Sequence, residues 1–296
     1  MNSGIKNDIS EFNEKLFFGF RNYLYEEHGI FINLDKKESV TAKLLERMKQ
    51  LHITSANDYL YLLGSDSGFE SEKSNLFDIL DLNEYYFHSN PDQVDAVINE
   101  ILPDIFNNDL RQENKYIRIL TIGKSSLIQS YSVFFALNAA FHNKRPDWVF
   151  LIQSYDLEEN STEKASDISY SKKYLQNMNI EIVKKYFLKT NNIEYKIKDD
   201  YSGIVSFLNF DFLSPCSKES LNLYDLIFCR NIMLFYDKQY KKPLTENLYS
   251  LLKPGGFLFL GDEESLHGVT PQFKLFLFPG SLAYKKEDTS SALPIF

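Results

Sequence analysis

The feature that most restricts the fold of this chain is an alternation of apolar runs and amphipathic segments over its second half. Four runs have the length and mostly apolar composition of buried strands: 116–123, 149–154, 224–229 and 256–261. Three segments with helical patterning follow strands in turn: 129–142, 158–166 and 238–252. Since parallel strands need a crossover that is usually a helix, this order predicts an α/β fold with a mostly parallel sheet covered on both faces.

The first hundred residues have a different, helical period. Phe12, Leu16, Phe20 and Leu24 recur every four residues and so share one face of a helix. Further helices are expected over three segments: Ser39–His52, Ser55–Leu63 and Pro91–Ile105. A loop rich in Gly and Ser is expected between them at 64–68.

These patterns divide the chain into three parts. We expect an amino-terminal helical domain with its linker over 8–108, an α/β domain over 109–286 and a flexible tail over 287–296. Two short strand-like runs, Glu194–Ile197 and Ile204–Phe207, indicate a small β-subdomain inserted near 190–210. Two runs around Pro279 and Gly280 predict an antiparallel hairpin at the sheet edge.

Charge and composition exclude several classes of function. The 296 residues carry a net charge of −9 and no basic patch, which argues against nucleic-acid binding. Two cysteines and five scattered histidines lack the spacing of metal ligands, so no metal site is expected. No apolar run approaches the roughly 18 residues of a membrane-spanning helix, and the first residues lack the apolar stretch of a signal peptide. We therefore expect a cytoplasmic protein without membrane insertion.

Polar residues follow three of the expected strands, at the strand ends where open α/β sheets bind ligands. Gly123 begins the first such loop, which lacks a dinucleotide or P-loop pattern and is equally compatible with an ordinary turn. Asp156 ends the second strand, where a carboxylate can accept hydrogen bonds from a ribose diol, although acids are common at strand ends. Arg230 and Asn231 follow the third, and an Arg there is either a ligand contact or the partner of a nearby carboxylate.

Four stretches of the sequence together resemble the CheR-type chemotaxis receptor methyltransferases. The strongest match is FCRNIMLFYD at 228–237, followed by LKPGGFLFLG at 252–261 and by Glu264-Ser265-Leu266. YDLE at 155–158 is similar to the family's TDID, and EKA at 163–165 to its LEKA. NEYYFHSNP at 83–91 is similar to the family's NETYFFRDP. The resemblance extends from about Phe12 to Lys286.

The resemblance implies a small helical domain, a seven-stranded Rossmann-like methyltransferase domain and S-adenosylmethionine as cofactor. From the resemblance, the residues expected to contact the cofactor are the following: Asn83, Gly123, Gln129, Asp156, Asp211, Phe212, Arg230 and Asn231. Of these, Asn83, Asp156, Arg230 and Asn231 keep the family residue. Arg230, with Tyr236 beside the position of the family tyrosine, is implied to lie at the methyl-transfer centre.

The chain departs from the family pattern at several of these positions. Ser89 replaces the family Arg, Leu127 and Gln129 fall where the family has Gly and Glu, and Phe235 replaces its Tyr. Ser89 removes a cation that would pair with the cofactor carboxylate, which predicts weaker binding by on the order of 1.5–3 kcal/mol.

Two functions follow from the resemblance, and a third, a nucleotide sensor that uses the cofactor pocket, is compatible with Asp156. One is methyl transfer from S-adenosylmethionine to glutamates of a chemoreceptor. The other is a catalytically inactive module of the same fold that docks to a receptor or another signalling protein.

Overall fold

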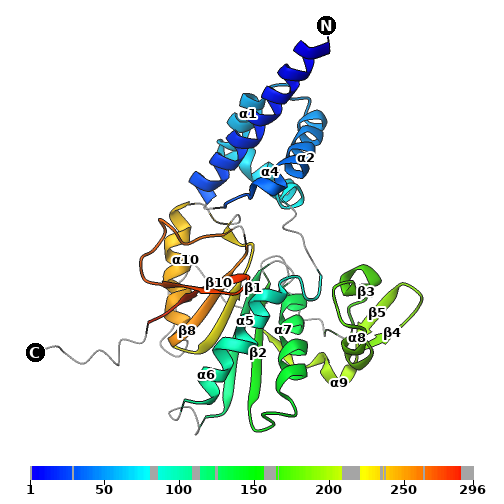
Figure 1. Cartoon of the computed structure of the whole chain (residues 1–296), viewed down its shortest axis with the longest axis vertical. Coiled ribbons are helices and arrows are strands. Elements are labelled where there is room, and N and C mark those ends of the chain that lie inside the picture. Colours follow the sequence, from blue (N-terminus) through cyan, green and yellow to red (C-terminus); the bar gives the residue numbers. More distant parts are fainter. Residues whose placement is uncertain are drawn as a thin grey trace, which may run out of the picture. The chain divides into compact units, whose positions relative to one another are not determined.

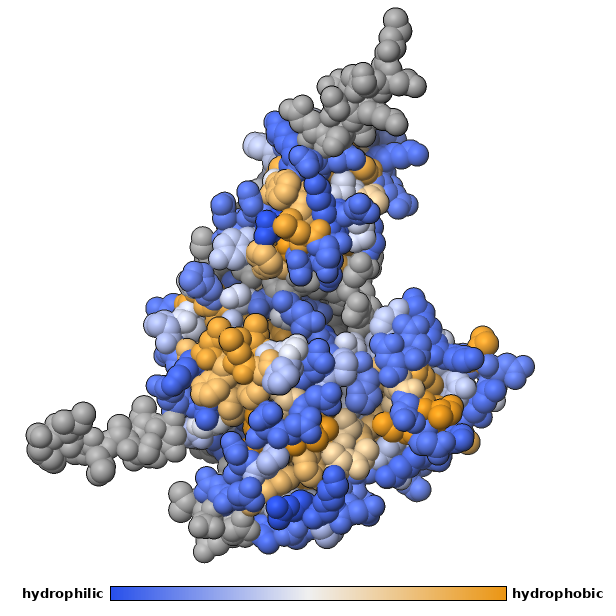
Figure 2. All heavy atoms as spheres, in the orientation of Figure 1, coloured by the Kyte–Doolittle hydropathy of each residue, from blue (hydrophilic) through white to orange (hydrophobic). Residues whose placement is uncertain are grey.

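The computed structural model describes residues 2–28, 30–80, 86–108, 114–123, 126–156, 165, 167–208, 221–233, 236, 238–262 and 264–287. The chain divides into two compact units. The first comprises Met1–Glu84, Asn231–Lys241 and Gly261–His267, and the second comprises Tyr85–Arg230, Lys242–Leu260 and Gly268–Phe296. On the face that Figure 2 shows, each unit is mainly hydrophilic with separate apolar areas.

The first unit is built from helices (Figure 1). They are α1 (Asn2–His28), the short η1 (Leu34–Lys36), α2 (Lys37–Gln50), α3 (Ala56–Leu63) and α4 (Asp66–Ile79). Leu16, Phe20 and Leu24 of the predicted apolar stripe are fully buried in the core of this unit. The predicted stripe is therefore confirmed for these three residues.

Helix α4 begins inside the segment 64–68 that the sequence predicts as a loop, so that prediction is wrong. The hydroxyl of Ser65 accepts a hydrogen bond from the backbone N–H of Gly68 at 3.3 Å, as a helix N-cap does. Gly68 is buried against α3, where an added Cβ would collide with the carbonyl oxygen of Leu62. The glycine thus marks close packing of two helices rather than a loop.

A charged cluster is buried between helices of the first unit. The guanidinium of Arg47 donates to both carboxylate oxygens of Glu72, at 2.9 and 2.6 Å, and the hydroxyl of Tyr59 donates to the same carboxylate at 3.2 Å. Glu72 is 1% exposed. Burial, followed by the carboxylate of Glu72, raises the pKa of Tyr59. This cluster joins α2, α3 and α4.

The second unit is built around a seven-stranded sheet, in the order β6-β2-β1-β7-β8-β10-β9. The strands are β1 (Tyr116–Gly123), β2 (Val149–Asp156), β6 (Val205–Phe207), β7 (Tyr224–Cys229), β8 (Leu252–Leu260), β9 (Lys274–Phe278) and β10 (Ser281–Lys285). Strands β6, β2, β1, β7 and β8 pair in parallel, whereas β10 runs antiparallel to β8 and to β9. The predicted α/β fold and edge hairpin are confirmed.

The strand order reverses direction between β1 and β7. From β1 the chain passes through α7 (Ser126–Phe141) to β2 on one side, and from β7 through α10 (Lys238–Leu251) to β8 on the other. Right-handed crossovers in opposite directions lie on opposite faces of the sheet. The carboxyl ends of β1 and β7 therefore form the topological switch point, where such sheets bind ligands.

The segment predicted as one helix over Pro91–Ile105 contains three helical pieces. They are α5 (Pro91–Ala96), a π-helical turn η2 (Val97–Ile101) and α6 (Leu102–Phe106). Pro103 has no backbone N–H to donate to the preceding turn, which explains a widened turn just before it.

A three-stranded antiparallel sheet forms the small subdomain, in the order β3-β5-β4. It contains β3 (Tyr170–Ser171), η4 (Lys172–Leu175), α8 (Ile180–Tyr186), β4 (Phe187–Lys189) and β5 (Glu194–Ile197), and α9 (Asp199–Ser202) follows. The sequence assigned the run at 204–207 to this region, but β6 instead pairs with β2 in the main sheet. Both runs form strands, and only the pairing in the folded chain assigns them to two different sheets.

Candidate functional site

The switch point brings Gly123 and Arg230 into direct contact. The backbone N–H of Arg230 donates to the carbonyl oxygen of Ile122 at 3.0 Å, which extends the pairing of β1 and β7 by one residue. A Cβ on Gly123 would lie 2.8 Å from the carbonyl oxygen of Arg230. Gly123 is therefore needed here because two strand ends approach closely, which is a structural reason for the glycine besides any contact with a ligand.

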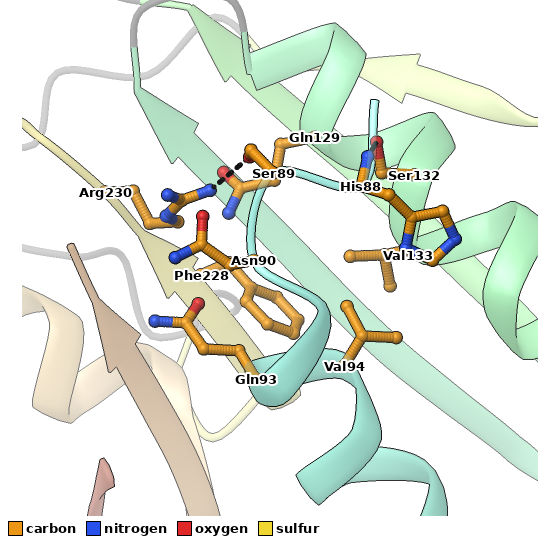
Figure 3. Close-up of a pocket in the computed structure, with 10 residues that line it drawn as sticks. All are labelled: His88, Ser89, Asn90, Gln93, Val94, Gln129, Ser132, Val133, Phe228 and Arg230. Atoms are coloured by element: carbon orange, nitrogen blue, oxygen red, sulfur yellow. Dashed lines mark hydrogen bonds between the residues drawn. The ribbon is translucent and has the colours of Figure 1, made fainter. Parts of the chain in front are cut away.

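A small pocket lies beside this switch point (Figure 3). Its lining comes from the segment leading into α5, from α7 and from the end of β7: His88, Ser89, Asn90, Gln93, Val94, Gln129, Ser132, Val133, Phe228 and Arg230. The cavity volume of about 20 Å³ is room for about one water molecule. Two of the residues predicted from the sequence, Gln129 and Arg230, are thus brought together with Ser89.

The side chain of Arg230 reaches across the pocket to Ser89. Its Nη1 donates to the hydroxyl oxygen of Ser89 at 3.1 Å. Ser89 follows His88, which has a φ of 60° and whose backbone N–H donates to the hydroxyl of Ser132 at 3.1 Å. The turn at His88 and the hydrogen bond to α7 fix the direction of the chain at Ser89. The guanidinium of Arg230 therefore lies beside Ser89, the residue that stands where the family motif has an Arg.

Gln93 is a polar residue of the pocket that sequence reasoning missed. Its Nε2 donates to the carbonyl oxygen of Leu260 at 2.7 Å, and the residue is 5% exposed. Its Oε1 is buried and accepts no hydrogen bond from the residues that the structure describes. Nothing in the sequence distinguishes Gln93 from other polar residues on the first turn of a helix.

The imidazole of His88 also lines the pocket. Burial lowers its pKa, and the carboxylate of Asp95 partly opposes this shift. The neutral imidazole is therefore the favoured form at neutral pH.

Buried hydroxyl groups hold the start of α7 against β1 and β2. Ser126 Oγ and Ser154 Oγ are 2.7 Å apart, and Thr121 Oγ1 and Ser130 Oγ are 2.5 Å apart. Leu127, which replaces the family glycine, is buried in the apolar core of the second unit. These contacts set the helix so that Gln129 lines the pocket.

The other predicted site residues are distributed as follows. The backbone of Asp156 ends β2 directly opposite Gly123 of β1. Asn231 and the half-buried Tyr236 are grouped with the first unit, and Asn231 has a φ of 57°. Asn83, Asp211, Phe212 and the departure at Phe235 lie outside the described residues.

The basic residues of α2 have different environments. Arg47 is held by Glu72, Lys43 is half-buried and Lys49 is exposed. The described part of the chain contains no cluster of three metal-ligating side chains and no helix that could cross a membrane.

Comparison with known families agrees with this fold. Residues 83–279 match the family described as CheR methyltransferase, SAM binding domain, and residues 15–80 match its all-alpha domain. The chain belongs to the CheR methyltransferase family. SAM in this description denotes S-adenosylmethionine.

Two relatives are named as chemotaxis methyltransferases. Chemotaxis protein methyltransferase 2 of Vibrio cholerae is 29% identical over 91% of this chain and 92% of its own length. The chemotaxis protein methyltransferase of Borreliella burgdorferi is 25% identical over 83% of this chain and 86% of its own length. The resemblance inferred from the motifs is therefore confirmed at the level of the family.

The polar groups of the pocket fit the amino-acid end of S-adenosylmethionine. The guanidinium of Arg230 is a partner for a carboxylate, and the buried Oε1 of Gln93 is an acceptor suited to an ammonium group. A carboxylate is larger than the one water molecule for which the cavity has room, so the lining side chains have to move apart when a ligand enters.

Proposed function

We propose that this protein transfers methyl groups from S-adenosylmethionine to glutamates of a chemoreceptor, with Arg230 as the cation that binds the cofactor carboxylate. The observation that carries the proposal is the hydrogen bond from Arg230 Nη1 to Ser89. The bond holds the guanidinium of Arg230 beside Ser89, where this chain lacks the family's second arginine. Arg230 therefore has to bind the carboxylate without the help of that second cation.

The remaining contacts of the amino-acid end follow from the chemistry of the pocket. Gln93 and Gln129 line it with neutral amides, whose oxygens can accept from an ammonium group. A neutral acceptor binds an ammonium less strongly than a carboxylate does. We therefore expect affinity to depend more on Arg230 than on either glutamine.

Asp156 is proposed to hold the ribose. It ends β2 beside the switch point, and a carboxylate there can accept from both hydroxyls of a ribose. Asn83, Asp211, Phe212, Asn231 and Tyr236 keep the cofactor or catalytic roles that the family resemblance gave them, as parts of this proposal.

Positioning is the main task left to the protein in this reaction. Bound S-adenosylmethionine supplies an activated methyl group on its sulfonium. Arg230 and Asp156 orient the two ends of the cofactor, and orientation of reactants accounts for a large part of rate enhancement in such transfers. No general acid or base is required when the accepting carboxylate is ionised.

The partner and location are part of the same proposal. A chemoreceptor is the expected partner because relatives are named as chemotaxis methyltransferases. The cytoplasm is the expected location, and the division at 8–108, 109–286 and 287–296 is the expected domain organisation. A module without catalytic activity is the alternative that the experiment below separates from the enzyme.

The test is calorimetric titration of the full chain with S-adenosylmethionine, followed by a methyl-transfer assay on receptor membranes. We expect the wild type to bind and to transfer methyl groups. Arg230→Ala should lower affinity tenfold to a hundredfold, which corresponds to about 1.5–3 kcal/mol.

Arg118→Ala, at the other end of the sheet, is the matched control and should bind as the wild type does. Binding without transfer would favour the inactive module, and an absence of binding would contradict the proposal.

A further inference from the structure

A buried carboxylate in the first unit organises the backbone that follows β7. Glu264 is 6% exposed, and its Oε2 accepts from the backbone N–H of Asn231 at 2.8 Å and of Gly261 at 2.9 Å. Its Oε1 accepts from the backbone N–H of Met233 at 2.7 Å. One side chain thus binds three backbone N–H groups from two chain segments.

The same segments meet closely around Gly261. A Cβ at this position would lie 2.9 Å from Oε2 of Glu264 and 3.2 Å from the backbone nitrogen of Asn231, and it would collide with Oδ1 of Asn231. The glycine is therefore required for the carboxylate to reach the backbone of 231–233.

Asn231 has the backbone conformation that such support explains. Its φ of 57° lies in the left-handed region, which residues other than glycine adopt uncommonly. Backbone in such regions persists where the surrounding structure fixes it, and this happens most often at binding sites. The backbone N–H groups of Asn231 and Met233 both donate to the carboxylate of Glu264. These hydrogen bonds fix the peptide before Asn231 and the peptide before Met233, on the two sides of the turn at 231–232.

We infer that Glu264 is a positioning residue: its carboxylate holds 231–233 in the conformation that presents Asn231 to the cofactor. The inference rests on the proposed function for the role of Asn231, and it adds a residue that makes no contact with the cofactor itself. The backbone of Glu264 also forms a β-bridge with Ile30, which follows α1. Glu264 therefore joins the chain at Ile30, after the end of α1, to the turn at Asn231.

Position 264 requires a carboxylate because both side-chain oxygens must accept hydrogen bonds. Three N–H donors converge on its two oxygens, each of which has two lone pairs. A glutamine has one acceptor oxygen, and its NH₂ group would face at least one backbone N–H. Glu264→Gln keeps the size of the side chain while removing at least one of the three hydrogen bonds.

The test compares the wild type, Glu264→Gln and Glu246→Gln, which alters an exposed glutamate of α10 and serves as the matched control. Backbone amide hydrogen exchange is measured by NMR at Asn231, Met233 and, as an internal reference, Leu258 of β8. Steady-state kinetics give kcat and the KM for S-adenosylmethionine. The wild-type exchange rates need no variant and so test the hydrogen bonds even where Glu264→Gln folds poorly.

We expect slow exchange at Asn231 and Met233 in the wild type and at least tenfold faster exchange in Glu264→Gln, with Leu258 unchanged. The KM should rise about tenfold with kcat changed less than threefold, because the loop binds the cofactor equally in the ground and transition states. The control should match the wild type.

Two results would overturn the inference. Exchange at Asn231 and Met233 in the wild type as fast as in an unfolded peptide would remove the positioning contact. A Glu264→Gln protein with a lowered melting temperature but an unchanged KM would make the carboxylate merely structural. If the wild type does not bind S-adenosylmethionine, the proposed function and the binding role both fail, while the exchange rates still decide whether Glu264 fixes the turn.

Discussion

Arg47 in the helical unit and Arg230 in the α/β unit both donate hydrogen bonds through their guanidinium groups, yet their surroundings differ. Arg47 makes a bidentate pair with Glu72, whose carboxylate is almost fully buried. Arg230 lines a pocket at the switch point and donates to the neutral hydroxyl of Ser89. The first arginine thus joins helices, whereas the second lines a pocket at the carboxyl ends of the strands.

The comparison shows what decides the use of a guanidinium. Both side chains are long, always charged and able to bind a carboxylate in a forked geometry. Arg47 finds that carboxylate within the protein, on a neighbouring helix. Arg230 follows the end of β7, and its guanidinium donates to the hydroxyl of Ser89 on the segment before α5. The predictions below test this division between a structural and a binding arginine.

The largest effect is expected from Arg47→Ala on stability. Removing the guanidinium leaves Glu72 buried without its cation, which costs about 3 kcal/mol of the free energy of unfolding. Urea denaturation of the wild type and the variant measures this, with Lys49→Ala, which alters an exposed lysine of the same helix, as control. A loss below about 1 kcal/mol would mean that the pair is not a structural element of this unit.

Arg230→Lys is expected to have the next largest effect, on affinity rather than on stability. Lysine keeps the positive charge but loses the planar fork that binds a carboxylate bidentately. We expect S-adenosylmethionine binding to weaken about tenfold, or by about 1.4 kcal/mol, in calorimetry. An unfolding free energy that falls as much as in Arg47→Ala would contradict the comparison, because Arg230 would then also be structural.

The strands were predicted well because their signal is local. Runs such as Tyr224–Cys229 are apolar except at Asp225 and buried at every position, so composition identifies them. The start of α4 was missed because Gly68 was interpreted as a loop residue, while in the structure it permits two helices to approach. The pairing of β6 with β2 was missed because three residues carry no information about their partner strand.

The site was predicted in part, for a related reason. Arg230 and Gln129 could be proposed from motif positions, and both line the pocket. The hydrogen bond between Arg230 and Ser89 joins residues 141 positions apart, so no local pattern contains it. Gln93 and Glu264 act through backbone groups of distant segments, and sequence preferences do not record such contacts.

Ser89→Ala tests how much the hydroxyl contributes to the placement of Arg230. The variant removes one hydrogen bond to a charged donor, so we expect affinity for S-adenosylmethionine to fall about fivefold, or by about 1 kcal/mol. Ser89→Thr keeps the hydroxyl and is the matched variant for comparison. If Ser89→Ala binds as tightly as the wild type, the hydroxyl is not needed to hold the guanidinium in place.

The smallest effect is expected from His88, and it depends on pH. Burial lowers the pKa of His88 in the folded protein, whereas an unfolded histidine titrates near about 6.5. As pH falls below this value, the unfolded chain takes up a proton more readily than the folded one, so stability is lost. Stability from the neutral imidazole is therefore present above about pH 6.5 and declines as pH falls through the lower pKa of the folded state.

His88→Asn should show a smaller decline of the unfolding free energy between about pH 7 and 5, because Asn tolerates a φ of 60° and does not titrate. Parallel unfolding curves for His142→Asn, which alters an exposed histidine, give the control, and an equal decline in wild type and His88→Asn would show that the imidazole is solvated in the folded state.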